Sequence, residues 1–231
     1  MDQINRGNMN SLRNCIAELI GTFFLVFAGT GAMVVNNYSG GALGHVGVAM
    51  TWGLIVLVII YTIGDVSGAH INPAVTIAFW LAKRFNGKEV IPYIIAQSIG
   101  AFLASIALKV MFPDNNTLGA SLPSGSWQQS FVMEVILTFL LMYVILNVSS
   151  GAKEKGIMAG TAIGATVGLE AMFAGPVSGA SMNPIRSIAP AAISGHTEHL
   201  WAYIVATILG ASLAVLTCKF TRKEECCNGD C

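Results

Sequence analysis

Six long apolar runs, separated by short polar stretches, dominate the pattern of hydrophobic and polar positions along the chain. They cover residues 15–35, 46–63, 90–111, 131–148, 158–173 and 199–217. A helix rises about 1.5 Å per residue, so runs of this kind suit the roughly 30 Å of hydrocarbon in a bilayer. The pattern predicts six membrane-spanning helices. Residues 113–126, rich in Asn, Gly, Ser and Pro, form a predicted surface loop in the middle.

The chain also repeats itself. Three pairs of similar strings recur in one order: ELIGTF at Glu18 and EVILTF at Glu134, SGAHINPAVT at Ser67 and SGASMNPIRS at Ser178, YIIAQSIGAFLA at Tyr93 and YIVATILGASLA at Tyr203. Each half holds three spans, an odd number, so the second half enters the membrane from the opposite side, as an inverted repeat. We predict one domain over residues 1–231, with repeats at about 12–112 and 127–220 and a tail at 221–231.

A short apolar run follows an Asn-Pro pair in each half, at Asn72-Pro73 and Asn183-Pro184. Asn is a favoured helix cap and Pro a favoured first helical residue, so each pair predicts a helix start. About ten residues extend only about 15 Å, half a bilayer. Two such half-helices entering from opposite faces would meet at the midplane, where irregular backbone requires burial in protein or a water-filled path. A pore is the predicted consequence, and two ordinary surface helices are the plainer alternative.

Composition and charge support a membrane protein and suggest its orientation. Hydrophobic residues make up 54% of the chain and charged residues 10%, outside the usual balance of soluble proteins. Ten of the twelve Lys and Arg residues fall on one side if the spans alternate, which predicts that both termini are cytoplasmic. No basic patch with interleaved aromatic residues occurs, so nucleic-acid binding is not expected.

The repeated strings resemble the aquaporin, or major intrinsic protein, family over nearly the whole chain, and most of all its nodulin-26-like and aquaglyceroporin-type channels. The resemblance implies an all-α membrane protein: an aquaporin-like inverted repeat of six transmembrane helices and two re-entrant half-helices, assembled as a homotetramer. It also implies a central constriction in which the Asn72 and Asn183 amides donate to passing water. The implied constriction comprises Asn72, Pro73, Ala74, Asn183, Pro184 and Ile185. Ile185 departs from the family's Ala and is large enough to narrow or dry the midpoint.

A second narrowing near the outer mouth is implied by the same resemblance. Counting from each Asn, its selectivity filter is Trp52, Ala171, Ala180 and Arg186. Water-selective members place His at the position of Ala171, whereas two alanines here leave the opening wide. Trp52 offers an apolar wall and Arg186 offers donors to hydroxyl groups, so the predicted solutes are water, glycerol and metalloid hydroxides such as arsenite.

Glu18, Glu134 and Glu170 lie within these apolar runs, where ionisable groups are costly, and His70 lies in the first repeated Ser-Gly-Ala motif. The resemblance favours Glu18 and Glu134 as structural anchors that accept hydrogen bonds from the re-entrant loops, and a proton relay is the alternative. Glu170 precedes a predicted filter position; we expect it to face the outer vestibule, with pairing to Arg186 or His199 as the alternative. For His70, a place at the cytoplasmic pore mouth and a structural hydrogen bond are equally open.

The cysteines predict no disulfide, because the cytoplasm keeps thiols reduced. Cys15 and Cys218 lie near helix ends, and Cys226, Cys227 and Cys231 lie in the tail, where metalloid binding or lipidation is an alternative to free thiols.

The sequence thus predicts a passive channel of a cell membrane, with no cofactor and no bound metal. A strict water channel is the first alternative. An inverted-repeat transporter would need coupling carboxylates, for which only Glu18 and Glu134 are available. A structural protein with negligible flux is a third possibility. An enzyme is not expected, because no nucleophile, base or metal-ligand set clusters in the spans.

Overall fold

A computed structural model describes residues 2–149 and 157–221, with side chains from residue 11 onward. All secondary structure in these residues is helical, as predicted. The helices are α1 (Asp2–Tyr38), α2 (Gly44–Ser67), α3 (Pro73–Leu81), α4 (Gly87–Met111), α5 (Trp127–Val148), α7 (Ala159–Ser178), α8 (Pro184–Ser194) and α9 (Leu200–Thr221). Parts of two predictions lie outside the described residues: the tail cysteines, and the basic residues Lys153, Lys155, Arg222 and Lys223.

Five of the described helices are long and apolar enough to cross a membrane: α1 from Ser11 onward, α2, α4, α5 and α9. The sixth predicted span corresponds to α7, whose 20 residues also extend about 30 Å. Four glycines and Glu170 keep the mean hydropathy of α7 below that of these five spans. A helix that packs inside the bundle can carry such residues, because protein rather than lipid surrounds it.

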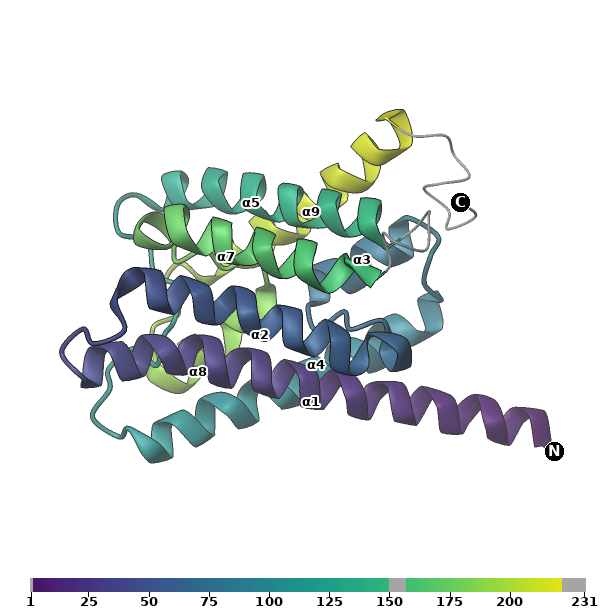
Figure 1. Ribbon diagram of the computed structural model, residues 1–231, viewed down its shortest axis with the longest axis horizontal. Helices are drawn as coiled ribbons and strands as arrows, with labels where there is room; N and C mark the ends of the chain where they lie inside the picture. The colour runs from purple at the N-terminus through teal and green to yellow at the C-terminus, as the bar shows by residue number, and fades with distance from the viewer. Residues whose placement is uncertain (1, 150–156, 222–231) are drawn as a thin grey trace.

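The two short helices occupy opposite ends of the bundle. Figure 1 shows α3 near the end of the bundle where α1 begins and α9 ends, and α8 near the other end. They have nine and eleven residues, so each reaches only about half of a membrane. Their first residues meet inside the molecule, where α3 contacts α8.

The helices pair as the internal repeat requires. In the first half α1 packs against α2 and α4, and in the second half α5 packs against α7 and α9. The two halves meet where α2 packs along α7, where α4 contacts α8 and where α3 contacts α9. Each half-helix is therefore held partly by the opposite half.

Glycines let α2 and α7 approach closely. A Cβ atom at Gly53 would lie 2.7 Å from the carbonyl oxygen of Gly164, and one at Gly164 would lie 2.6 Å from the carbonyl oxygen of Gly53. Any side chain at either position would force the helices apart. Gly53 and Gly164 thus allow close packing of α2 against α7.

Candidate functional site

The N-termini of the two half-helices face each other at the centre of the bundle. Asn72 and Asn183 each adopt extended backbone immediately before the first proline. The Asn72 Oδ1 accepts from the amide of Ala74 at 2.9 Å, and the Asn183 Oδ1 accepts from the amide of Ile185 at 3.1 Å. Each side chain therefore caps the positive end of its own helix.

The same two side chains tie the halves together. Asn72 Nδ2 donates to the carbonyl of Met182 at 2.8 Å, and Asn183 Nδ2 donates to the carbonyl of Ile71 at 2.9 Å. An amide nitrogen carries two hydrogens, so each Asn keeps one N–H beyond this bond. Both residues line the central cavity.

The loops that precede the half-helices hold an unusual backbone. Ala69 and Ile71 in the first half, and Ala180 and Met182 in the second, have φ values of 47°, 42°, 43° and 55°. Residues other than glycine avoid this left-handed region, at a cost of about 1–3 kcal/mol each. Such loops persist only where surrounding contacts impose them.

The Glu18 carboxylate supplies contacts of that kind in the first half. It accepts from the hydroxyl of Ser67 at 2.7 Å, from the amides of His70 and Ile71 at 2.8 and 2.6 Å, and from Gln97 Nε2 at 2.8 Å. The Glu18 side chain is completely buried. Four donors around one carboxylate satisfy its lone pairs inside the bundle.

Glu134 has the same surroundings in the second half. It accepts from the hydroxyl of Ser178 at 2.7 Å and from the amides of Ser181 and Met182 at 2.8 Å each. These residues are related by the repeat to the partners of Glu18. In both halves, a buried carboxylate therefore binds the amides of the strained loop.

Two tyrosines complete the loops, and we did not predict them from the sequence. Tyr93 donates to the carbonyl of Ser67 at 2.9 Å, and Tyr203 donates to the carbonyl of Ser178 at 2.7 Å. Both residues begin the third repeated string, which we interpreted only as part of a span. A polar group at matched positions of two apolar repeats was the available signal.

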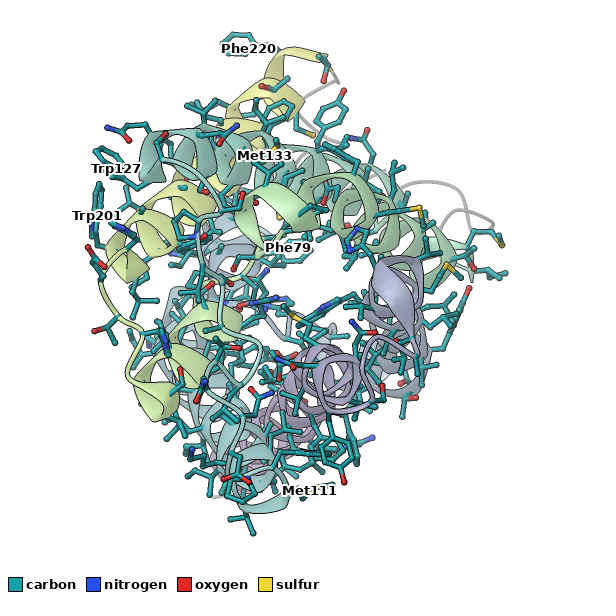
Figure 2. All side chains as sticks on the ribbon, turned by 90° about the vertical axis from the view of Figure 1, so that its left-hand side faces the viewer. Phe79, Met111, Trp127, Met133, Trp201 and Phe220 are labelled. Carbon is teal, nitrogen blue, oxygen red and sulfur yellow. The ribbon has the colours of Figure 1, made fainter. Side chains whose placement is uncertain are left out.

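The central cavity has a volume of about 970 Å³ and passes the facing helix ends. Its lining extends along α2 from Trp52 to Asp65, a distance of about 20 Å. Both asparagines, His70, Phe79 and Arg186 also line it. Figure 2, which views the bundle end-on, shows an opening near Phe79, while Trp127, Trp201 and Met111 lie at the outside.

Three of the four predicted filter residues border this cavity. Trp52, Ala180 and Arg186 line it, and the guanidinium carbon of Arg186 lies 4.7 Å from the centre of the Trp52 ring. Ala171 is buried on α7, four residues after the lining residue Val167, but is not itself among the lining residues. The structure thus brings an apolar aromatic face and a cation together beside a small side chain.

Backbone and hydroxyl oxygens hold Arg186 in place. Its Nη1 donates to the carbonyl of Gly119 at 3.2 Å and to the hydroxyl of Ser121, and its Nη2 donates to the carbonyl of Gly179 at 3.3 Å. Arg186 is 1% exposed. The charge is therefore fixed by dipoles and has no carboxylate partner among these contacts.

Two of those acceptors lie in residues 113–126, where the predicted surface loop is confirmed in part: residues 113, 114, 116, 122 and 124–126 are exposed, whereas residues 118–121 are buried. Leu118, Ala120 and Ser121 are 0%, 6% and 5% exposed, and the side-chain oxygen of Asn115 accepts from the amide of Leu118 at 2.8 Å. The segment folds inward because the buried guanidinium requires oxygen partners. Its polar composition was consistent with a loop but not informative about where that loop lies.

Ile185 does not face the cavity. It is 3% exposed and packs in a cluster with Val26, Ala101, Ala104 and Ala189. The larger side chain thus fills space between α8, α1 and α4. Its equivalent in the first half, Ala74, is 1% exposed and also absent from the lining.

The expected vestibule position of Glu170 is wrong. Its side chain is 0% exposed, and among the described residues neither carboxylate oxygen has a hydrogen-bond partner. Arg186 donates elsewhere, and His199 lies 3.8 Å from Glu198. Glu170 therefore lies inside the helix bundle.

His70 combines both of its expected roles. Its ring lines the cavity and stacks on Phe79 at 4.7 Å between ring centres, while Nδ1 lies 3.2 Å from the Thr76 hydroxyl.

Among the described cysteines, Cys15 is partly buried and Cys218 is buried, and neither forms a disulfide.

Comparison with known proteins gives a consistent result. The sequence profile of the major intrinsic protein family matches residues 6–218. Aquaporin NIP1-1 of Zea mays is 45% identical over 216 residues, which are 92% of this chain and 77% of the relative. Nodulin-26 of Glycine max is 44% identical over 201 residues, which are 87% of this chain and 74% of that relative. The X-ray structure of the aquaglyceroporin from Plasmodium falciparum matches with a TM-score of 0.77 and 26% identity, over 92% of this chain and 96% of that one.

Proposed function

Because this chain belongs to the major intrinsic protein family, we propose a range of solutes for its pore that extends beyond water. The protein is an integral, multi-pass membrane protein and a passive channel for water and small solutes. Within that class, we propose that its solutes include glycerol and metalloid hydroxides such as arsenite. We also propose that the pore excludes protons and ions.

The observation that carries this proposal is the wall of the cavity at Trp52, Ala180 and Arg186. A polyol presents carbon on one side and hydroxyl groups on the other. The Trp52 ring offers an apolar surface to the carbon atoms, and the guanidinium 4.7 Å from its centre offers donors to hydroxyl oxygens. The methyl side chain of Ala180 leaves the room that a larger residue would take.

Charge exclusion follows from what surrounds the path. The facing N-termini of α3 and α8 each carry partial positive charge, and Arg186 adds a full one. The second N–H of Asn72 and of Asn183 is available to orient each passing water molecule. A cation at the facing helix ends would meet this positive potential, and the lining carboxylate of Asp65 lies about 20 Å along α2 from Trp52, away from Arg186.

The solute range is tested by stopped-flow light scattering of proteoliposomes in gradients of water, glycerol and arsenite. Our proposal requires faster equilibration of all three than in protein-free vesicles. Fast water with glycerol at the protein-free rate would support the alternative of a strict water channel.

The orientation and assembly of the channel belong to the same proposal. Arg13 lies in the first third of α1, Lys83 and Lys88 lie where α3 ends and α4 begins, and Lys219 lies in the last turn of α9. Figure 1 shows the start of α1, the end of α9 and the connection from α3 to α4 at the same end of the bundle. The positive-inside rule then places both termini in the cytoplasm. By analogy with the family, we propose a homotetramer in which each subunit has its own pore.

Protease added outside intact cells tests the orientation. A tag at either terminus should remain intact, whereas a protease site inserted after Gly195, in the turn that follows α8, should be cut. Cleavage of both terminal tags with protection of the inserted site would reverse the topology.

A further inference from the structure

A proline breaks the hydrogen-bond ladder of α7 near its outer end. Pro176 lies inside this helix and has no N–H group. In a regular helix the amide of residue 176 would donate to the carbonyl of Met172, four residues earlier. That carbonyl therefore lacks its usual partner, and it directly follows the predicted filter residue Ala171.

A histidine from another helix supplies the missing donor. His45, in the first turn of α2, places its Nε2 2.6 Å from the carbonyl oxygen of Met172. A carbonyl only accepts, so Nε2 carries the hydrogen in this bond. A Cβ atom at Gly175 would lie 2.9 Å from the His45 ring, so glycine leaves the space that the ring occupies.

This bond holds the outer end of the α2 and α7 pair. At the inner end, Tyr61 of α2 donates to the carbonyl of Ile157 at 2.8 Å and lies 3.1 Å from the Thr161 hydroxyl. Between the two ends, the helices touch at the Gly53 and Gly164 backbones. Contacts thus hold α2 and α7 together at the middle and at both ends.

We infer that His45 is a positioning residue for solute selection, acting through the Met172 carbonyl to set the distance between α2 and α7 at the outer mouth. It lies about 10 Å along α2 from Trp52, and its partner is adjacent to Ala171. Without the bond, the outer turn of α7 is free to move away from α2. The inference rests on the proposed function, in that Trp52 lines the cavity and Ala171 is a predicted filter residue.

The test measures permeability to water, urea, glycerol and erythritol, a series of increasing size, in proteoliposomes of matched protein density. His45→Leu should raise erythritol permeability relative to glycerol by about fivefold, the equivalent of one ordinary hydrogen bond. His45→Gln keeps a side-chain N–H and should stay near the wild type. His196→Leu serves as a matched control, because this exposed ring bonds only to Ser194 in its own turn.

The double variant separates positioning from general damage. Pro176→Ala restores an amide that can reach the Met172 carbonyl within α7. Added to His45→Leu, it should return the ratio of erythritol to glycerol to the wild-type value. Equal loss of all four fluxes in His45→Leu, an unchanged size cut-off, or failure of Pro176→Ala to restore it would overturn the inference.

The proposed function is judged separately, from the wild-type protein alone. Wild-type vesicles that pass water without glycerol would remove the proposed solute range. The role of His45 would still be decided by whether the size cut-off moves between the wild type and His45→Leu.

Discussion

At the scale of single residues, Arg186 shows how a charge can be kept inside a membrane protein. Two backbone carbonyls and the Ser121 hydroxyl accept from it, and the Trp52 ring lies beside it. Dipoles of this kind stabilise the cation but leave its net charge in place, whereas a carboxylate would neutralise it. The positive potential of Arg186 therefore still acts on the cavity that this residue lines.

Replacement of this residue gives the first prediction. Arg186→Val should raise proton or cation leak by roughly tenfold, the effect of a barrier lowered by about 1.4 kcal/mol, while water flux survives. The reason is twofold: the positive charge is gone, and the carbonyls of Gly119 and Gly179 are left free to bind cations. Currents in voltage-clamped cells measure the leak. Arg186→Lys, which keeps the charge, is the control, and an Arg186→Val leak equal to the wild type would remove this residue from its assigned role.

At the scale of elements, the half-helices depend on the carboxylates behind them. Each left-handed loop turns back into the bundle, where its amides point at Glu18 or Glu134. An anchoring role and a proton relay make different demands on these groups. An anchor must accept several hydrogen bonds at once, whereas a relay must exchange a proton.

Glu18→Gln distinguishes the two. The amide keeps one acceptor oxygen but turns an NH₂ group toward donors such as the Ile71 amide, so we expect a loss of about 1–3 kcal/mol in stability. Thermal unfolding in detergent and the yield of folded protein measure this loss. Glu198→Gln, at an exposed side chain, should change neither. An equally stable Glu18→Gln protein with altered proton flux would favour the relay.

The short helices were predictable from the sequence because their signals are local. An Asn followed by Pro specifies a helix start, and both α3 and α8 begin at that proline. The inward fold of residues 113–126 was not predictable, because the partner that draws Ser121 inside is Arg186, more than sixty residues away. His45 was missed for the same reason: its partner is a carbonyl freed by a proline in the other half.

At the scale of the whole molecule, the inverted repeat joins two half-paths into one cavity. The first half contributes Trp52 and Asn72, and the second contributes Asn183 and Arg186. The repeat and the family resemblance predicted this arrangement correctly at the level of the fold. The close approach of α2 and α7 was not predicted, because it depends on glycines in the two different halves.

The central claim is that the outer opening selects solutes by size, and we predict that Ala171, buried on α7 four residues after the lining residue Val167, leaves that opening wide. Ala171→His is the most direct test, because a three-carbon polyol needs more room than a single file of water. Glycerol and water permeability are compared in wild-type and variant proteoliposomes at matched protein density. Ala165→His, the same change on the exposed side of α7, is the control for folding.

Ala171→His should lower glycerol permeability by about tenfold or more, the discrimination that a close steric fit commonly gives, while most water permeability remains. Ala165→His should leave the ratio of the two fluxes unchanged. Unchanged glycerol flux in Ala171→His protein would contradict the account, because position 171 would then not border the opening through which solutes pass.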